Sequence, residues 1–263
     1  MTRRYLIYPT GFLLALGISS VLLLLIGINP LTAYWVLAYG AFGSTYNIGE
    51  TLTKFIPLLL CALAFTLPAK SGFWNIGGEG QLHLGALAAL LLAFNLEGLP
   101  SVISISLIIA GSFLAGMAFI SLPLILRVKL NINEMFTTMI LNFIGILLVA
   151  YLCVGPLKDP GSINPQTSVI PPSTWFPRIL PPSRFHLGII FPLCLAFLLQ
   201  LMYEKTSLGY KIRLLGHPKA ASYAGINISR IMAITFLIGG GLAGLAGMGE
   251  VLTNRAMDAE EIK

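Results

Sequence analysis

Charged residues are scarce in this chain, and their scarcity excludes a water-soluble globular fold. Asp, Glu, Lys and Arg make up only 10% of the 263 residues, whereas soluble domains carry about a quarter. Hydrophobic residues reach 56%, which is more apolar surface than a soluble core of this size can bury. The composition therefore predicts an all-α, polytopic membrane helix bundle, with residues 1–263 as a single transmembrane domain.

Cysteine is also rare, and nucleotide-binding motifs are missing. Cys61, Cys153 and Cys194 lie far apart in or beside apolar runs, with no CxxC pair and no Cys/His cluster. This excludes a disulfide framework and a cysteine metal site, so we expect no metal or cofactor. A GxxxxGK[ST] sequence is absent as well, so any ATP that drives the protein must be hydrolysed on another chain.

Seven apolar segments are candidate membrane crossings, and one of them is interrupted. Leu82–Phe94 is too short to cross alone, because a spanning helix needs about 20 apolar residues. Counting Phe73–Ile76 as part of the same crossing, with a glycine-rich break between, restores the length and predicts a discontinuous helix of the kind that transporters use. The seven segments are Gly11–Ile28, Leu52–Leu67, Leu82–Phe94, Val102–Leu126, Met135–Val154, Leu187–Tyr203 and Ile231–Leu252.

The placement of Lys and Arg predicts the orientation in the cell membrane. The net charge of +6 does not indicate nucleic-acid binding, since the basic residues lie in connecting segments. Arg3 and Arg4 put the N-terminus in the cytoplasm by the positive-inside rule. Counting crossings then puts these basic positions on the same side: Lys70, Arg127, Lys129 and the segment 204–230.

The segment 155–186 falls on the outer side and is rich in proline. Successive prolines do not form a helix, so an extended or turn-rich structure is expected. A flexible linker is the alternative. Trp175 and Phe176, two large apolar side chains among the prolines, favour a packed external cap.

The interrupted crossing carries polar residues among glycines at membrane depth. Asn75, Glu79, Gln81 and His83 lie in the run Gly72–Leu84. Polar groups in the membrane are costly and usually mark a path for an ion or solute. We expect Glu79 to accept hydrogen bonds from the exposed backbone of the break; direct contact with a solute is the alternative. His83 is expected to be an ordinary residue of the bundle interior.

A second polar set lies in the following apolar run. Glu134, Thr138 and Asn142 are spaced at i, i+4 and i+8, which places them on one helical face. Such a stripe faces the bundle interior. It predicts either one wall of a translocation path or hydrogen bonds that hold the helices together. Glu134 could instead be a first-turn acid at the cytoplasmic interface.

Two further patterns concern packing and docking. Gly240, Gly244 and Gly247 form a small-residue face that predicts close helix packing. In the segment 204–230, helical spacing of apolar residues followed by Pro218 predicts two short amphipathic helices. They would form a docking surface for a cytoplasmic partner, unless the segment is only a solvated basic loop.

Three stretches carry a resemblance to a known family: Phe73–Gln81, Asn133–Asn142 and Ala220–Gly247. In this order and across essentially the whole chain, they resemble the permease subunits of ABC importers for nucleosides and simple sugars, which are related to branched-chain amino acid permeases. The resemblance implies a translocation path through the chain, a second permease subunit, cytoplasmic ATP-binding subunits and an external substrate-binding protein. It also makes 204–230 the loop that couples to the ATPase, through Leu208, Gly209, Ile212, Arg213, Gly216, Ala220, Ala221 and Gly225.

The resemblance predicts further spanning helices after Ile231–Leu252, so the sequence is expected to be a C-terminally truncated permease. Two alternative functions remain: a stand-alone secondary carrier and a truncated fragment that transports nothing. A polytopic membrane enzyme is disfavoured, because Glu79 and His83 are the only i, i+4 pair suited to acid–base chemistry. The sequence does not identify the solute.

Overall fold

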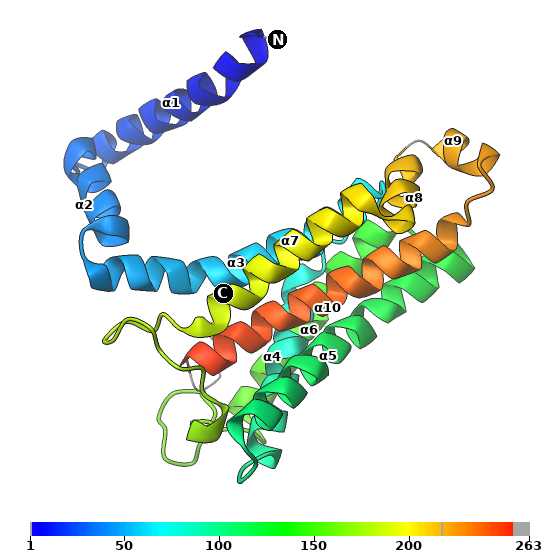
Figure 1. Ribbon diagram of the computed structural model, residues 1–263. Coiled ribbons are helices and arrows are strands. Elements are labelled where there is room, and N and C mark those ends of the chain that lie inside the picture. The colour runs from blue at the N-terminus through cyan, green and yellow to red at the C-terminus, as the bar shows by residue number, and fades with distance from the viewer. Residues whose placement is uncertain (1, 217, 255–263) are drawn as a thin grey trace. The chain divides into compact units, whose positions relative to one another are not determined.

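The computed structural model describes residues 2–216 and 218–254, in two units, Met1–Thr51 and Leu52–Lys263, which are treated separately below. The described part of the chain is helical and contains no strand. Figure 1 traces the elements along the chain. The helices are α1 Thr2–Leu25, α2 Pro30–Phe42, α3 Thr45–Lys70, α4 Gly78–Asn95, α5 Ser101–Leu130, α6 Glu134–Val154, η1 Pro172–Thr174, η2 Leu187–Ile189, α7 Ile190–Lys205, α8 Ser207–Leu215, α9 Pro218–Tyr223 and α10 Ile228–Asn254.

The first unit consists of α1, α2 and the first turns of α3. The Asn29 side chain caps α2 by accepting a hydrogen bond from the Leu31 backbone at 3.0 Å. Polar contacts join α1 and α2 at Tyr34, whose hydroxyl donates to the Leu16 carbonyl at 2.8 Å and also contacts the hydroxyls of Ser19 at 2.7 Å and Ser20 at 3.0 Å. Apart from Thr32, the other side chains of α2 are apolar or aromatic, and no residue of α2 is buried, as expected for a segment in contact with lipid.

Within the described residues, six helices are long and apolar enough to cross a membrane: α1, α3, α5, α6, η2 with α7, and α10. This confirms the predicted all-α polytopic fold. The interrupted crossing differs in detail from the expectation. Phe73–Gly77 is extended rather than helical, and Gly78 and Gly80 belong to the first turn of α4 instead of separating two helical halves. The 18 residues of α4 reach about 27 Å, so the extended stretch completes the crossing.

The centre of the second unit is α10, which packs against α4 and α5 (Figure 1). Backbones approach one another so closely that there is no room for side chains. A Cβ added to Gly247 would lie 1.9 Å from the Leu82 carbonyl oxygen, and one added to Gly244 would lie 2.3 Å from the Ser112 carbonyl oxygen. A Cβ on Gly240 would meet the Ile120 side chain at 2.4 Å. The glycines thus allow α10 to be the most enclosed of the spanning helices.

The proline-rich segment between α6 and α7 is packed against the second unit. Ile170 is fully buried and accepts a hydrogen bond from the Trp175 indole at 3.1 Å. The Phe176 ring stacks on His186 at a centroid distance of 5.0 Å. His186 in turn contacts the Thr253 hydroxyl at 2.7 Å through Nε2. The segment is therefore held against the C-terminal turn of α10.

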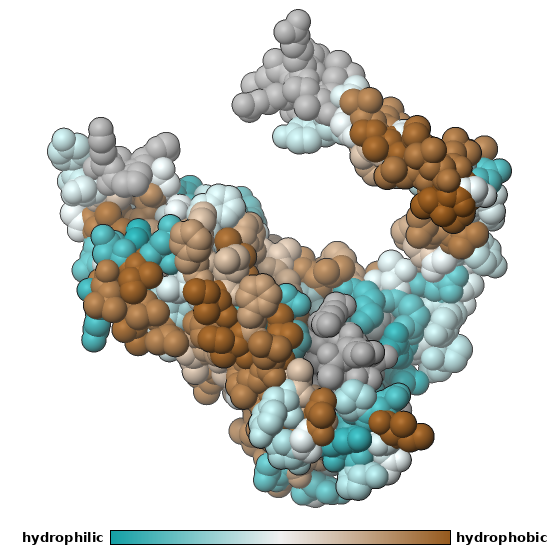
Figure 2. All heavy atoms as spheres, turned by 180° about the vertical axis from the view of Figure 1, so that it is seen from behind, coloured by the Kyte–Doolittle hydropathy of each residue, from teal (hydrophilic) through white to brown (hydrophobic). Residues whose placement is uncertain are grey.

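Apolar side chains also cover much of the surface of this unit. Figure 2 shows them over the middle of the displayed face, with hydrophilic side chains gathered toward its ends. Leu147 on α6 and Phe197 on α7 are among the large exposed residues. This distribution is the one expected when lipid surrounds the bundle and water meets its two ends.

Candidate functional site

The interrupted crossing begins with a tight turn after α3. Ser71 donates from its backbone to the Pro68 carbonyl at 2.9 Å, and Gly72 follows with a left-handed φ of +84°. A residue with a side chain rarely adopts this conformation, which accounts for glycine at this position. The chain then runs extended through Phe73–Gly77 and enters α4 at Gly78.

An extended backbone at membrane depth needs partners for its N–H groups. Three polar side chains provide them. The Asn75 Oδ1 accepts from Gly77 at 3.1 Å, the Thr138 hydroxyl accepts from Ile76 at 3.2 Å, and Asn142 Oδ1 accepts from Gly80. Two of these side chains come from α6, so α6 supplies much of the polar support for the break.

Asn75 and Gln81 fix the break from within. Their side-chain amides exchange two hydrogen bonds, of 3.0 and 2.9 Å, and both residues are buried. A reciprocal pair of this kind leaves few polar atoms unsatisfied in a low-dielectric interior. His83 lies one helical turn after Glu79 and contacts the Glu79 carbonyl oxygen at 2.8 Å through Nδ1. His83 is buried inside the bundle, where sequence reasoning placed it.

Glu79 occupies a different position from the one expected. The backbone N–H groups of the break donate to Asn75, Thr138 and Asn142, whereas the Glu79 carboxylate accepts at 3.1 Å from Asn142 Nδ2. The reason is geometric: Glu79 lies on the exposed side of α4, where Asn142 is the partner that it meets. Asn142 therefore joins the carboxylate to the backbone of the break through its two amide atoms.

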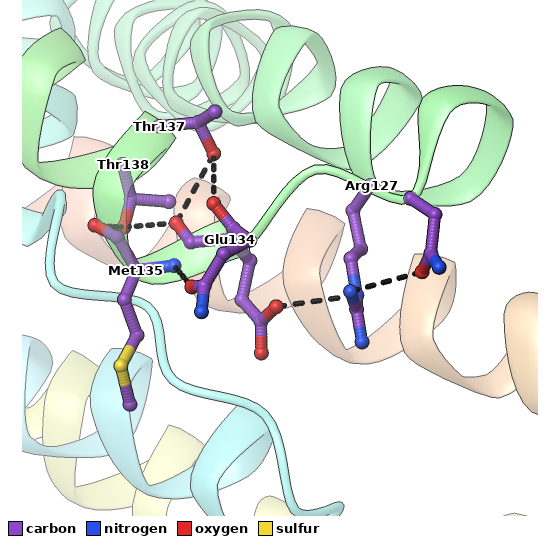
Figure 3. A network of polar contacts seen from close by, with 7 residues as sticks. Arg127, Glu134, Met135, Thr137 and Thr138 are labelled. Carbon is purple, nitrogen blue, oxygen red and sulfur yellow. Dashed lines mark hydrogen bonds and ion pairs between the residues drawn. The ribbon is translucent and has the colours of Figure 1, made fainter.

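The polar stripe of α6 divides into two parts. Glu134 lies at the first turn, is buried, and forms an ion pair with Arg127 Nε at 3.2 Å (Figure 3). Thr138 donates its hydroxyl to the Glu134 carbonyl at 2.7 Å while also supporting the break. Glu134 thus belongs to the end of the bundle, as the interfacial alternative predicted, and only Thr138 and Asn142 reach the break.

Glycine allows α4 and α6 to come together here. A Cβ on Gly77 would lie 2.8 Å from the Thr138 carbonyl oxygen, and one on Gly80 would lie 2.9 Å from Asn142 Cα. Beside this contact a cavity of about 470 Å³ opens. Its lining comes from α3, the extended stretch and the first turns of α4: Cys61, Ala64, Phe65, Asn75, Ile76, Gly78, Glu79 and Leu82.

The segment 204–230 forms the two short helices that the sequence predicted, α8 and α9. Ile212 and Leu215 are buried with Leu67 of α3 and Ile231 of α10, and Leu208 packs against this cluster. Gly209 is needed for the close approach of α8 to α7, since an added Cβ would lie 2.2 Å from the Tyr203 carbonyl oxygen. One face of α8 is therefore fixed to the bundle.

The remaining residues predicted for this segment take different places. Arg213 is exposed and donates to the Tyr203 carbonyl, while Ala221 is buried. Gly216 ends α8, and Gly225 turns the chain with a left-handed φ of +67°. The side chain of Ala220 lies outside the described residues.

Phe73 connects this segment to the break. It packs against the cluster that contains Ile212 and Leu215, and its ring meets Phe236 of α10 edge-on at 6.3 Å. A Cβ on Gly72 would lie 3.6 Å from the Leu215 carbonyl oxygen. The start of the extended stretch is therefore in contact with α8.

Several contacts were not foreseen from the sequence. Lys70 lies 3.8 Å above the Tyr203 ring and joins the ends of α3 and α7. Gly85 and Gly116 face Gly244 and Gly240 of α10, with added Cβ atoms at 2.1 Å from carbonyl oxygens. Gly85 and Gly116 are isolated glycines inside apolar helical runs, and this was the sequence signal that could have found them.

These features define a class: a polytopic α-helical membrane protein whose one interrupted crossing carries a polar site, with two short helices at one end of the bundle. The sequence profile of the branched-chain amino acid transport system / permease component family matches residues 47–262. The chain belongs to this family. The predicted relationship to ABC permeases is thereby confirmed.

Three relatives illustrate the range of the family. The chain is 31% identical to a glucose ABC transporter permease of Haloferax volcanii, 28% to a nucleoside ABC transporter permease of Lactococcus lactis and 31% to a guanosine ABC transporter permease of Bacillus subtilis. The matches cover 91%, 94% and 96% of this chain, and 66%, 70% and 74% of the relatives. The chain thus spans about two thirds to three quarters of their length. No solved structure matches.

Proposed function

We propose that the chain is a permease subunit of an ATP-driven importer and forms part of the translocation path for a nucleoside or a simple-sugar-like solute. Family membership and the glucose, nucleoside and guanosine permeases among the relatives support this assignment. ATP is hydrolysed on separate cytoplasmic subunits. The chain itself contributes binding groups and a path, with no catalytic residue.

The observation that carries the proposal is the exposed carboxylate of Glu79. Its partner Asn142 lies two turns along α6 from Glu134, about 12 Å from the ion-paired end of that helix. A carboxylate at such a depth is too costly to face lipid, and it faces either a water-filled path or another subunit. Apolar neighbours such as Phe143 of α6 are exposed as well, so lipid or a second permease subunit covers the rest of this surface.

The groups around the break suit an uncharged, hydroxyl-rich solute. The cavity beside α4 has a mostly apolar wall from Ala64, Phe65 and Leu82, and polar atoms from Asn75 and Glu79. A carboxylate accepts hydrogen bonds from sugar hydroxyls or ring N–H groups, and apolar walls pack on a sugar or base face. Because Asn75 and Asn142 are already bonded to the break, Glu79 is the group with acceptor capacity to spare.

The segment 204–230 is proposed to couple the bundle to the ATP-binding subunits from the cytoplasmic side. Its buried face is fixed by Ile212 and Leu215, and Tyr210 of the same helix remains exposed. Through Phe73, a movement of α8 would displace the extended stretch that leads to Glu79. The packed segment 155–186 then lies outside the cell, where a substrate-binding protein delivers the solute.

The test is uptake by the assembled transporter, with its ATP-binding subunits, second permease and binding protein co-expressed. Labelled guanosine and labelled glucose are offered separately to cells with the wild-type chain, Glu79→Gln and Glu97→Gln. Glu97 is a matched control acid in the turn after α4. We expect uptake of one solute, lost on Glu79→Gln and kept with Glu97→Gln; unchanged uptake with Glu79→Gln would refute the proposed path.

A further inference from the structure

A second cavity, of about 390 Å³, lies where α8 meets the start of α10. Its volume is within the range of small-ligand sites. The polar lining residues are Ser207 and Lys211 of α8 and Asn227 and Arg230 at the start of α10. This cavity is separate from the one beside Glu79, with which it shares no lining residue.

The polar rim of this cavity is basic. Lys211 and Arg230 are exposed, and no described residue forms an ion pair with either side chain. No acidic residue is among the lining residues. Two cations without a described counter-charge attract an anion, and the attraction is strongest near a surface where water is partly excluded.

The floor of the cavity is apolar and follows one face of α10. Asn227, Arg230, Ile231 and Ile234 are spaced so that they lie on one side of the helix, from its N-cap into its second turn. Polarity therefore decreases along this face: an amide and a guanidinium come first, and two isoleucines follow. Leu208 and Ile226 add to the apolar wall.

We propose that this cavity binds an anionic phospholipid, with the phosphate between Lys211 and Arg230 and an acyl chain along Ile231 and Ile234. Basic pockets between membrane helices at a leaflet surface are suited to anionic head groups. The graded polarity favours a lipid over an acidic protein segment, because the isoleucines belong to a helix that is long and apolar enough to span a membrane. The inference does not depend on which solute the protein moves.

The position of the cavity gives the bound lipid a role. α8 is fixed on its buried face by Ile212 and Leu215, and the cavity lies on another side of the same helix. A lipid there would join α8 to the start of α10 and stiffen the segment proposed to receive force from the ATPase. The anionic lipid content of the membrane would then affect the stability of this segment.

The test is lipid binding by the purified full-length chain in detergent, counted by native mass spectrometry during titration with phosphatidylglycerol. The double variant Lys211→Gln/Arg230→Gln is compared with Lys129→Gln/Lys205→Gln, which removes the same charge from exposed positions outside the cavity. We expect the first double variant to bind phosphatidylglycerol roughly 30-fold more weakly, which corresponds to about 1 kcal/mol for each cation. The control variant should bind like the wild type.

Two further arms identify the ligand. Ile234→Thr should weaken phosphatidylglycerol binding, and glycerol phosphate, which has no acyl chain, should not displace the lipid at equal concentration. Equal binding of glycerol phosphate and lipid would overturn the proposal in favour of a free phosphate site. Unchanged lipid binding by Lys211→Gln/Arg230→Gln would also overturn it, and loss of the ATP-binding subunits by that variant would then assign the cavity to an acidic protein surface.

Discussion

The helix α4 makes two contacts that are built differently. Against α10 the contact depends on missing side chains, with Gly85 and Gly247 allowing the backbones to touch. Against α6 the contact contains polar side chains as well as glycines, and Asn142 bonds both to the backbone of the break and to Glu79. The difference separates two kinds of effect: filling the first contact should unfold the bundle, and altering the second should change a local site.

The largest expected effect comes from filling the contact between α4 and α10. Gly247→Val would place side-chain atoms inside the backbone of Leu82 and Ala86, so we expect a loss of more than about 4 kcal/mol or no folded protein. The measurement is the yield and thermal unfolding of monodisperse protein in detergent. Gly249→Ala is the control on the same helix, because its Cβ would meet Ile56 at an ordinary 3.8 Å.

The opposite result would be informative for the comparison. If Gly247→Val and Gly249→Ala unfolded at the same temperature, the close contact of α10 with α4 would not be a determinant of stability. The distinction between a packing contact and a polar contact of α4 would then fail.

The next effect concerns the polar contact at the C-terminal end of α10. Burial, with the positive charge of Arg178, lowers the pKa of His186 from 6.5 to about 4. The unfolded chain therefore takes up a proton at a higher pH than the folded chain. The contribution of His186 to the free energy of unfolding is fully present above about pH 6.5. It is lost as the pH falls toward 4, by about 3 kcal/mol in total.

Thermal unfolding of the wild type and of His186→Gln between pH 7.5 and 4 measures this dependence. The wild type should lose stability more steeply across that window, because the neutral ring accepts a hydrogen bond from Gly188 at 3.0 Å and contacts Thr253. Parallel curves for the two proteins would show that His186 does not hold the segment against α10.

A smaller effect is expected at the break. Asn142→Leu leaves the Gly80 N–H without its acceptor and Glu79 without its donor, at a cost of about 1–3 kcal/mol. We expect the rate of solute uptake to fall strongly while the unfolding temperature in detergent falls only slightly, because the geometry of the break is lost while the helices stay packed. Thr137→Ala is the control in the same helix, since Thr137 bonds only to carbonyls of its own first turn. Equal losses of uptake with Asn142→Leu and Thr137→Ala would contradict the role of Asn142 in supporting the break.

Patterns with a regular period were predictable from the sequence, and single contacts between distant residues were not. The spacing of Gly240, Gly244 and Gly247 indicated a packing face, but the sequence did not show that Gly85 and Gly116 lie opposite. The spacing of Thr138 and Asn142 placed both on one face. That Asn142, and not Glu79, supports the backbone of the break follows from a tertiary contact across 62 residues.

The interrupted crossing shows the same limit. Its short apolar run and its glycines indicated a break, since Leu82–Phe94 could not span a bilayer alone. Glycine is compatible with both an extended stretch and a helical first turn. In the structure Gly78 begins α4, and Thr138 and Asn142 of α6 accept hydrogen bonds from the backbone on either side of it, at Ile76 and Gly80.

The central claim is that Glu79 faces an aqueous path, and thiol labelling tests it most directly. In a chain whose native cysteines are replaced by alanine, Glu79→Cys and Phe143→Cys are exposed to a small charged methanethiosulfonate reagent in the assembled transporter. Phe143, exposed on α6 beside Asn142, is the control on the apolar surface that lipid or a second permease subunit covers. We expect rapid labelling at position 79 and little at position 143. Equal labelling at both positions, or none at 79, would contradict it.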